Sequence, residues 1–176
     1  AKSIESGQLT LSFASLTYTG SPITATNATV SLDGTELVEG TDFTVAYTDN
    51  VAAGTATATA TGIGAYTGTL STTFDISAAD LRQARVTMPN LVYTGGALTP
   101  QPTSVTYEAG GTTCALEQDV DYRIAGYTNN TNVGDATIVL QGMGNFTGML
   151  IANWKVVAQG TENAGVTQTL PQTADM

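Results

Sequence analysis

Residues Gly54–Phe74 read Gly-Thr-Ala-Thr-Ala-Thr-Ala-Thr-Gly-Ile-Gly-Ala-Tyr-Thr-Gly-Thr-Leu-Ser-Thr-Thr-Phe, and eighty positions later Gly134–Trp154 read Gly-Asp-Ala-Thr-Ile-Val-Leu-Gln-Gly-Met-Gly-Asn-Phe-Thr-Gly-Met-Leu-Ile-Ala-Asn-Trp. Every glycine of the first copy keeps its place in the second. Strict alternation of side chains is the period of a half-buried strand, and the glycines between the two alternating runs indicate a turn. A strand, a turn and a strand that recur at a fixed offset predict two copies of one small β-domain.

The repeat divides the 176 residues into four parts. We predict a first β-domain over residues 1–76, a short linker over 77–83, a second β-domain over 84–157 and a disordered tail over 158–176. The composition is rich in Thr, Gly, Ala and Val, charged residues make up only 11%, and no long apolar helix pattern appears. This profile predicts an all-β fold.

The two copies differ in length at two places, and the differences indicate where a longer loop and a bulge lie. Leu9, Leu11 and Phe13 form an alternating strand, which we match with Ala84, Val86 and Met88 at an offset of seventy-five. The offset grows to seventy-nine after a hairpin tip, where Asp33-Gly34 in the first copy corresponds to the longer stretch 108–115 in the second. It reaches eighty at Gly126, where one added residue predicts a β-bulge.

The alternation also predicts which side chains face the core. The members of the signature strand that we place inside are small in the first copy and larger in the second: Ala56, Ala58 and Ala60 against Ala136, Ile138 and Leu140. Each buried CH₂ contributes about 0.8 kcal/mol to stability. We therefore expect the first domain to be the less stable one.

The charge excludes several classes of partner. Five Lys and Arg face fifteen Asp and Glu, which gives a formal charge of −10. No basic patch exists that would bind nucleic acid or an anionic membrane surface. No apolar run is long enough to span a bilayer, so we expect no membrane insertion of this segment. Acidity favours solubility, and we expect a monomer.

The residue inventory argues against an enzyme. The chain has no histidine, which removes Ser-His and Cys-His nucleophile pairs and the commonest zinc ligand. The single cysteine, Cys114, excludes an internal disulfide, and we interpret it as a bystander thiol. The sequence pattern indicates no pair of carboxylates for general acid–base catalysis. We therefore expect no catalytic residues, no cofactor and no metal.

Three weaker alternatives remain at individual residues. Asp119 with Asp121, or Asp42 with Asp49, offer oxygens to calcium, but turn-capping is the preferred interpretation because no calcium-loop motif surrounds them. Lys155 is the residue type that forms an intramolecular isopeptide bond with asparagine, although its alternation with Trp154 predicts that it points outward. Tyr107 and Cys114 occupy the longer hairpin tip and are the candidates for ligand contact, whereas the tyrosines matched in both copies are expected to pack.

The tail carries Leu170-Pro171-Gln172-Thr173-Ala174. These residues resemble the Leu-Pro-any-Thr-Gly signal by which sortases attach proteins to the Gram-positive cell wall, with Ala174 in place of the glycine. The resemblance implies cleavage after Thr173 and a sortase as processing partner. Proline and a polar surround keep such a peptide extended and accessible.

The repeat resembles the MBG-type or YGX-type tandem domains of bacterial surface proteins and, more loosely, bacterial Ig-like modules. The likeness rests on residues 16–20, 40–50 and 62–68 and on their second-copy counterparts, and it covers about residues 9–157. It implies an extracellular, wall-anchored adhesin or stalk without catalysis.

From the repeat and this resemblance we expect two tandem β-sandwich domains of the Ig-like type, with a β-grasp-like sheet as the alternative. Two further functions stay open: a module that binds a host glycan or an extracellular-matrix protein, and an accessory domain of a secreted enzyme.

Overall fold

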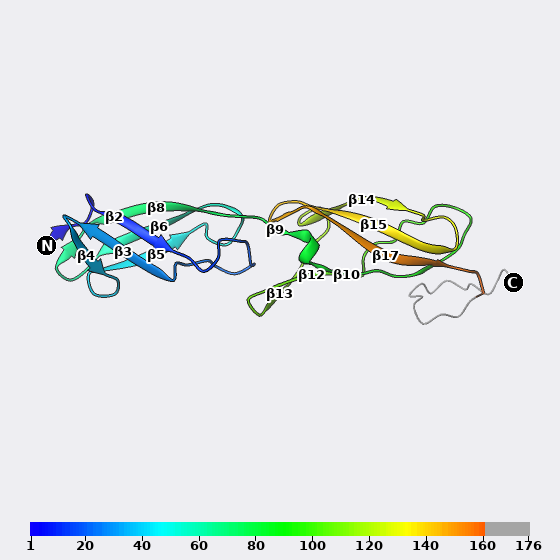
Figure 1. Ribbon diagram of the computed structural model, residues 1–176, viewed down its shortest axis with the longest axis horizontal. Helices are drawn as coiled ribbons and strands as arrows, with labels where there is room; N and C mark the ends of the chain where they lie inside the picture. Colours follow the sequence, from blue (N-terminus) through cyan, green and yellow to red (C-terminus); the bar gives the residue numbers. More distant parts are fainter. Residues whose placement is uncertain (161–176) are drawn as a thin grey trace. The chain divides into compact units, whose positions relative to one another are not determined.

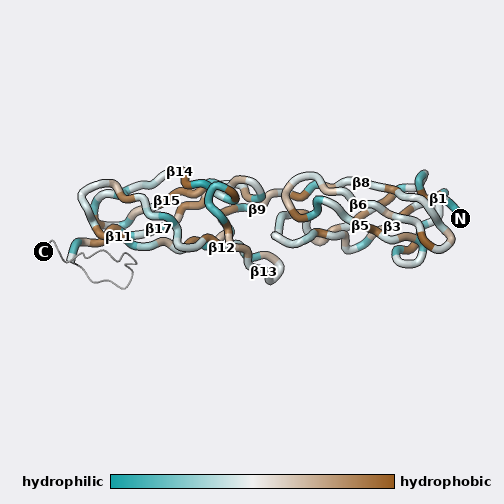
Figure 2. The backbone as a smooth tube through the Cα atoms, turned by 180° about the vertical axis from the view of Figure 1, so that it is seen from behind, coloured by the Kyte–Doolittle hydropathy of each residue, from teal (hydrophilic) through white to brown (hydrophobic). Residues whose placement is uncertain are grey.

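The computed structural model describes residues 1–160, and strands dominate it (Figure 1). The described residues contain no α-helix, and one short 3-10 helix spans Leu81–Gln83 (η1). The predicted all-β class is confirmed. Contacts divide the chain into two compact units, Ala1–Ala78 and Ala79–Met176. Hydrophobic residues, brown in Figure 2, occur along both units.

Unit 1 consists of a pair of short parallel strands and two three-stranded antiparallel sheets, ordered β1-β7, β2-β3-β4 and β5-β6-β8. The strands are β1 (Lys2–Ser3), β2 (Gln8–Ser12), β3 (Asn27–Leu32), β4 (Thr35–Val38), β5 (Phe43–Thr48), β6 (Gly54–Gly62), β7 (Tyr66–Thr67) and β8 (Thr69–Ile76). The predicted signature strand, turn and strand are β6, the β7 region and β8.

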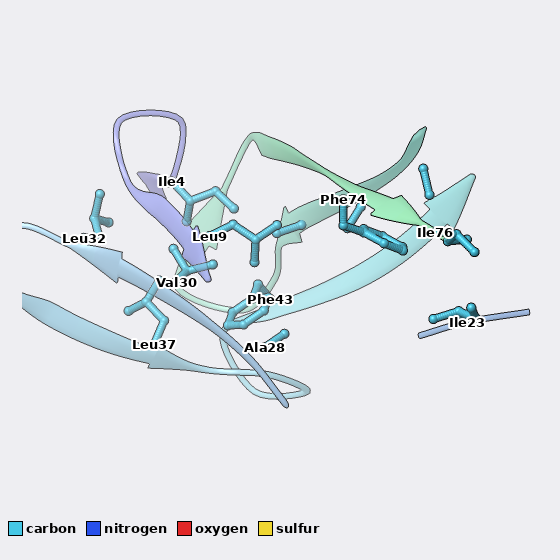
Figure 3. Close-up of a cluster of buried hydrophobic side chains, with 13 residues drawn as sticks. Ile4, Leu9, Ile23, Ala28, Val30, Leu32, Leu37, Phe43, Phe74 and Ile76 are labelled. Carbon is cyan, nitrogen blue, oxygen red and sulfur yellow. The ribbon is translucent and has the colours of Figure 1, made fainter. Parts of the chain in front are cut away.

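Side chains from both three-stranded sheets of unit 1 form one core, and Figure 3 shows them pointing toward one another between the strands. On β6 the alanines at 56, 58 and 60 are fully buried, as the alternation predicts. Phe43 on β5 and Val30 on β3 are also fully buried. Phe13 adds bulk from the loop after β2, because its ring centroid lies 4.6 Å from that of Phe74.

Unit 2 repeats this plan with sheets ordered β10-β12-β13, β11-β17-β15-β14 and β16-β9. Its strands are β9 (Ala79–Asp80), β10 (Arg85–Thr87), β11 (Leu91–Val92), β12 (Ser104–Ala109), β13 (Thr112–Ala115), β14 (Tyr122–Thr128), β15 (Gly134–Gly142), β16 (Phe146–Thr147) and β17 (Met149–Val157). Ile138 and Leu140 on β15 are fully buried, and Trp154 on β17 is 3% exposed.

The β-bulge predicted near Gly126 is present. The register between β14 and β15 shifts between Ile124 and Gly126, which leaves Ala125 without an opposite residue. The shift keeps Tyr127 opposite Ile138 and so preserves the inward direction of the tyrosine ring.

Both hairpin tips are two-residue turns with positive φ at both positions. Asp33 and Gly34 have φ of 51° and 79°, and Gly110 and Gly111 have φ of 57° and 81°. These angles suit the primed turns that match strand twist. The four residues added in the second copy lengthen the hairpin arms by the pairs Glu108↔Thr113 and Ala109↔Thr112, and an even insertion keeps the same side chains facing in.

The match proposed for the first strand is wrong by two residues. Leu9 pairs with Val30, and Val86 pairs with Val105, so the equivalent of Leu9 is Val86, at an offset of seventy-seven. Unit 2 is two residues shorter in the loop that follows this strand. Two is also the period of a strand, so the predicted inward face is still correct.

Residues 79–83 of the expected linker belong to unit 2. Ala79 is fully buried in β9, which pairs with β16, and Leu81 is fully buried in η1. In unit 1 the residue equivalent to Leu81 is Ile4, which is also fully buried. Of the expected tail, residues 161–176 lie outside the described part, whereas Gln159 Nε2 donates to the Tyr93 carbonyl at 3.0 Å.

Candidate functional site

The tyrosines repeated in both copies hold loops. The Tyr47 hydroxyl accepts from the Ala25 backbone N–H at 3.1 Å. The equivalent position of unit 2 is Pro100, which has no N–H, and there the Tyr127 hydroxyl donates to the Pro100 carbonyl at 2.9 Å. The hydroxyl thus changes from acceptor to donor while the ring keeps its place, which assigns these tyrosines to the fold.

The matched asparagines have the same kind of role. Asn50 Nδ2 donates to the Ile23 carbonyl at 3.0 Å, and the Ile23 N–H donates back to the Asn50 carbonyl at 2.8 Å. Asn130 and Leu98 form the same reciprocal pair in unit 2, at 2.8 Å in both directions. These amides bind loop backbone and lie at the ends of β5 and β14.

The aspartates considered for calcium cap turns instead. The Asp42 carboxylate accepts from the Val38 N–H at 2.8 Å, and the Asp121 carboxylate accepts from the Glu117 N–H at 2.9 Å. Asp49 and Asp119 have positive φ of 56° and 67°, which aspartate tolerates in turns. Within residues 1–160 no group of three or more His, Cys, Asp or Glu side chains is placed to hold a metal ion.

Tyr107, a predicted ligand contact, is a core residue. Its side chain is 4% exposed, and its ring meets Phe146 edge-on with centroids 5.2 Å apart. The prediction fails because Tyr107 lies at the base of the lengthened hairpin, where β12 still faces the core. Cys114 lies opposite Tyr107 and is half-buried.

Lys155 points outward, as the alternation predicts. Its Nζ lies 2.5 Å from Asp135 Oδ1, and both side chains are largely exposed, at 59% and 81%. Asn90, from the segment before β11, accepts the Lys155 backbone N–H at 2.9 Å. This amine is exposed to water, so it lacks the dry surroundings that make a lysine nucleophilic.

Two adjoining hollows in unit 2 share Asp135. The first, of about 350 Å³, is lined by Asn90, Asp135, Asn153, Trp154 and Lys155. The second, of about 410 Å³, is formed by the loop from Asn129 to Asp135. We call these two together the amide hollow, because five asparagines line them. They are Asn90, Asn129, Asn130, Asn132 and Asn153, of which Asn130 also holds the loop at Leu98.

The Trp154 side chain lies on the inner face of β17, on the side opposite to the outward Asn153 and Lys155. The residue is 3% exposed, and its Nε1 has no hydrogen-bond partner among residues 1–160. A buried donor without a partner costs about 1–3 kcal/mol. Sequence reasoning did not find this site, although a position-by-position comparison of the copies would have shown the asparagines.

Packing and capping account for the pKa shifts of Tyr122 and Asp80. Burial, followed by the charges of Asp119 and Asp121, raises the pKa of Tyr122. The side chain and backbone of Arg82 lower the pKa of Asp80, which caps η1 at the surface. Both shifts follow from packing or capping.

The outer faces of the two main sheets differ. On β6 and β8 the exposed side bears hydroxyl residues, with Thr59 and Ser71 bonded at 2.9 Å. The same side of unit 2 exposes Met149 at 53% and Ile151 at 64%. One backbone therefore supports either surface.

The sortase-like residues Leu170, Pro171, Gln172, Thr173 and Ala174 lie outside the described residues. Among residues 1–160, no helix has the length and apolar character needed to cross a bilayer. A comparison with protein-family models, with curated proteins and with solved structures finds no match to this chain.

Proposed function

We propose that the chain is a non-catalytic stalk or adhesin segment of a Gram-positive cell-wall-anchored surface protein, built from two tandem Ig-like β-sandwich domains. One observation carries the proposal. The polar residues repeated between the copies are used to hold the fold, as the Tyr47 and Tyr127 loop contacts illustrate. Residues that a duplicated chain retains for shape suit a spacer that presents a distal surface.

The sandwich assignment is supported in unit 1 by two three-stranded antiparallel sheets whose side chains share one core. A β-grasp-like arrangement would place the strands in one sheet and leave its face to be covered by a helix. The main sheets suit load bearing, because β8 and β17 are each held by eight residue pairs to β6 and β15. A force that pulls along β8 or β17 must break all eight pairs of that strand at the same time.

Single-molecule pulling between residues 1 and 160 tests the stalk. We expect two separate unfolding events, one for each unit, with the weaker event in unit 1. A single event that releases the whole chain would contradict two independent load-bearing domains.

Wall attachment has its own test on the intact 176-residue chain. A sortase and a glycine peptide should break the Thr173–Ala174 peptide bond, release Ala174–Met176 with a new amino terminus, and join the Thr173 carbonyl to the glycine amine. Mass spectrometry reads the product, and the Pro171→Ala chain is the control. An unchanged mass with sortases of several specificities would refute the anchoring proposal.

A further inference from the structure

We propose that the outer edge of β5 in unit 1 pairs with the same edge of a second copy of this chain, in an antiparallel arrangement with Ala46 at its centre. The inference goes beyond the stalk proposal, and the pairing itself does not depend on that proposal. It rests on the open backbone groups of β5, on two half-buried side chains beside them and on the different edge of unit 2.

The strand β5 is the end strand of the sheet β5-β6-β8. The Phe43 C=O accepts from the Gly40 N–H at 2.7 Å, on the side away from β6. Backbone groups alternate in direction along an antiparallel strand, so those of Val45 and Tyr47 also face away from β6. Within residues 1–160 the outer side of β5 forms one bridge, between Glu39 and Phe43. The N–H and C=O groups of Val45 and Tyr47 are therefore open to a further strand.

The side chains beside these groups leave the core open at the same edge. Val45 and Tyr47 pack against the core but are half-buried, whereas Phe43, at the end that the Glu39 bridge covers, is fully buried. The outer-face residues at 44, 46 and 48 are small, uncharged and exposed. An added strand would thus cover apolar surface without burying a charge.

The corresponding edge of unit 2 has two features that oppose pairing. Gly126 is the added residue of the bulge, which breaks the regular spacing of the edge groups in β14. Arg123 stands where unit 1 has Thr44, and its guanidinium donates to Gln141. Bulges and charges are the devices by which sheet edges avoid association. The strand β5 has neither, since its six residues pair with β6 without a register shift.

A second copy of the same edge is the strand that fits. When Val45 of one copy lies opposite Tyr47 of the other, twofold symmetry repeats this pair and places Ala46 opposite Ala46. Each Val45–Tyr47 pair then exchanges both of its backbone hydrogen bonds. Side chains that lie opposite each other share a face, so the half-buried Val45 and Tyr47 cover each other. A slip of one residue would place inner side chains opposite outer ones and lose this cover.

The strand directions give the contact a polarity. Both β5 and β8 are antiparallel to β6, so the chain leaves unit 1 along the direction of β5. Two paired copies therefore leave the contact in opposite directions. This geometry suits chains that extend from two facing cell surfaces, where many weak contacts act together, and that consequence rests on the proposed surface location.

Sedimentation of the full chain over a range of concentrations tests the pairing. The edge is short and the chain carries a formal charge of −10, so association should be weak and should increase with salt. The mean mass should rise above that of one chain as the concentration approaches about 1 mM in about 0.5 M salt. In a chain labelled with ¹⁵N, the amide signals of Val45 and Tyr47 should shift with concentration, whereas those of Ile124 and Tyr127 on β14 should stay constant.

Charged variants locate the contact. Ala46→Lys and Ala46→Glu each place like charges opposite each other and should weaken self-association about tenfold. An equimolar mixture of the two variants should restore it, because opposite charges then meet. Thr59→Lys is the control, since Thr59 lies beside Ala46 on the central strand β6 and away from the edge. It should leave association within about twofold.

A mass that stays at one chain over the whole range would overturn the proposal. Association that Ala46→Lys leaves unchanged, or a mixture that fails to restore it, would also overturn it, because the contact would then lie elsewhere. None of these results affects the pulling of single chains, so failure of the edge contact and failure of the stalk are distinguishable.

Discussion

The replacement of Leu140 by alanine tests whether the core of unit 2 depends on the larger residues of its signature strand. Leu140 is fully buried on β15 and lies opposite Ile124 on β14 and Leu150 on β17. The substitution removes three carbon atoms, which costs about 2.4 kcal/mol in transfer free energy at about 0.8 kcal/mol for each. The residual cavity adds to this, and Leu→Ala changes in cores cost about 2–5 kcal/mol in total.

Unit 1 indicates that the backbone itself tolerates the change, because Ala60 occupies the equivalent position and is fully buried. Ala60 lies opposite Val45 and Leu70. The neighbours of Leu140, among them Ile124 and Leu150 opposite it, are packed around a leucine instead. We therefore expect Leu140→Ala to leave a space that unit 2 fills only in part.

Urea unfolding followed by Trp154 emission measures the effect in unit 2 alone, since Trp154 is the single tryptophan and is buried there. The matched control is Ile151→Ala on β17, whose side chain is 64% exposed and should change the free energy of unfolding by less than about 0.5 kcal/mol. If Leu140→Ala and Ile151→Ala lower the stability equally, the assignment of the inner face is wrong.

Three further predictions concern stability. Urea unfolding of the whole chain should show two transitions, with backbone circular dichroism changing before Trp154 emission because the alanines of β6 bury less apolar surface; coincident transitions would contradict this order. Gly142→Ala should lower the free energy of unfolding by about 1–3 kcal/mol, because a Cβ at this position would lie 2.8 Å from the Phe146 carbonyl carbon. A Cβ at Gly126 would meet nothing within 4 Å, so Gly126→Ala should change the free energy of unfolding by less than about 0.5 kcal/mol. Stability should fall as pH rises above about 10, because the fold raises the pKa of Tyr122 and the unfolded chain loses its phenol proton first. The Tyr122→Phe variant should show a smaller decrease of the urea midpoint with pH. An unchanged decrease would refute the assignment to Tyr122.

The sequence alone was sufficient to predict the all-β class, the inner faces of the signature strands and the bulge beside Gly126, because these follow from a local period of two and from small insertions between the copies. An odd insertion must be absorbed by a bulge, and an even one leaves the faces unchanged. This is why the face of the first strand was predicted correctly although its match was two residues off.

Only the tertiary structure decided what depends on neighbours distant in sequence. Tyr107 looked like a surface residue because it lies near a hairpin tip, but the lengthened arms place it against Phe146. Asn90 and Lys155 are 65 residues apart and meet only because the segment before β11 lies beside β17. A periodic pattern specifies which side of a strand is apolar, but it carries no information about which strand packs beside it. The part of the amide hollow that Asn90, Asn153 and Lys155 line exists only through that pairing.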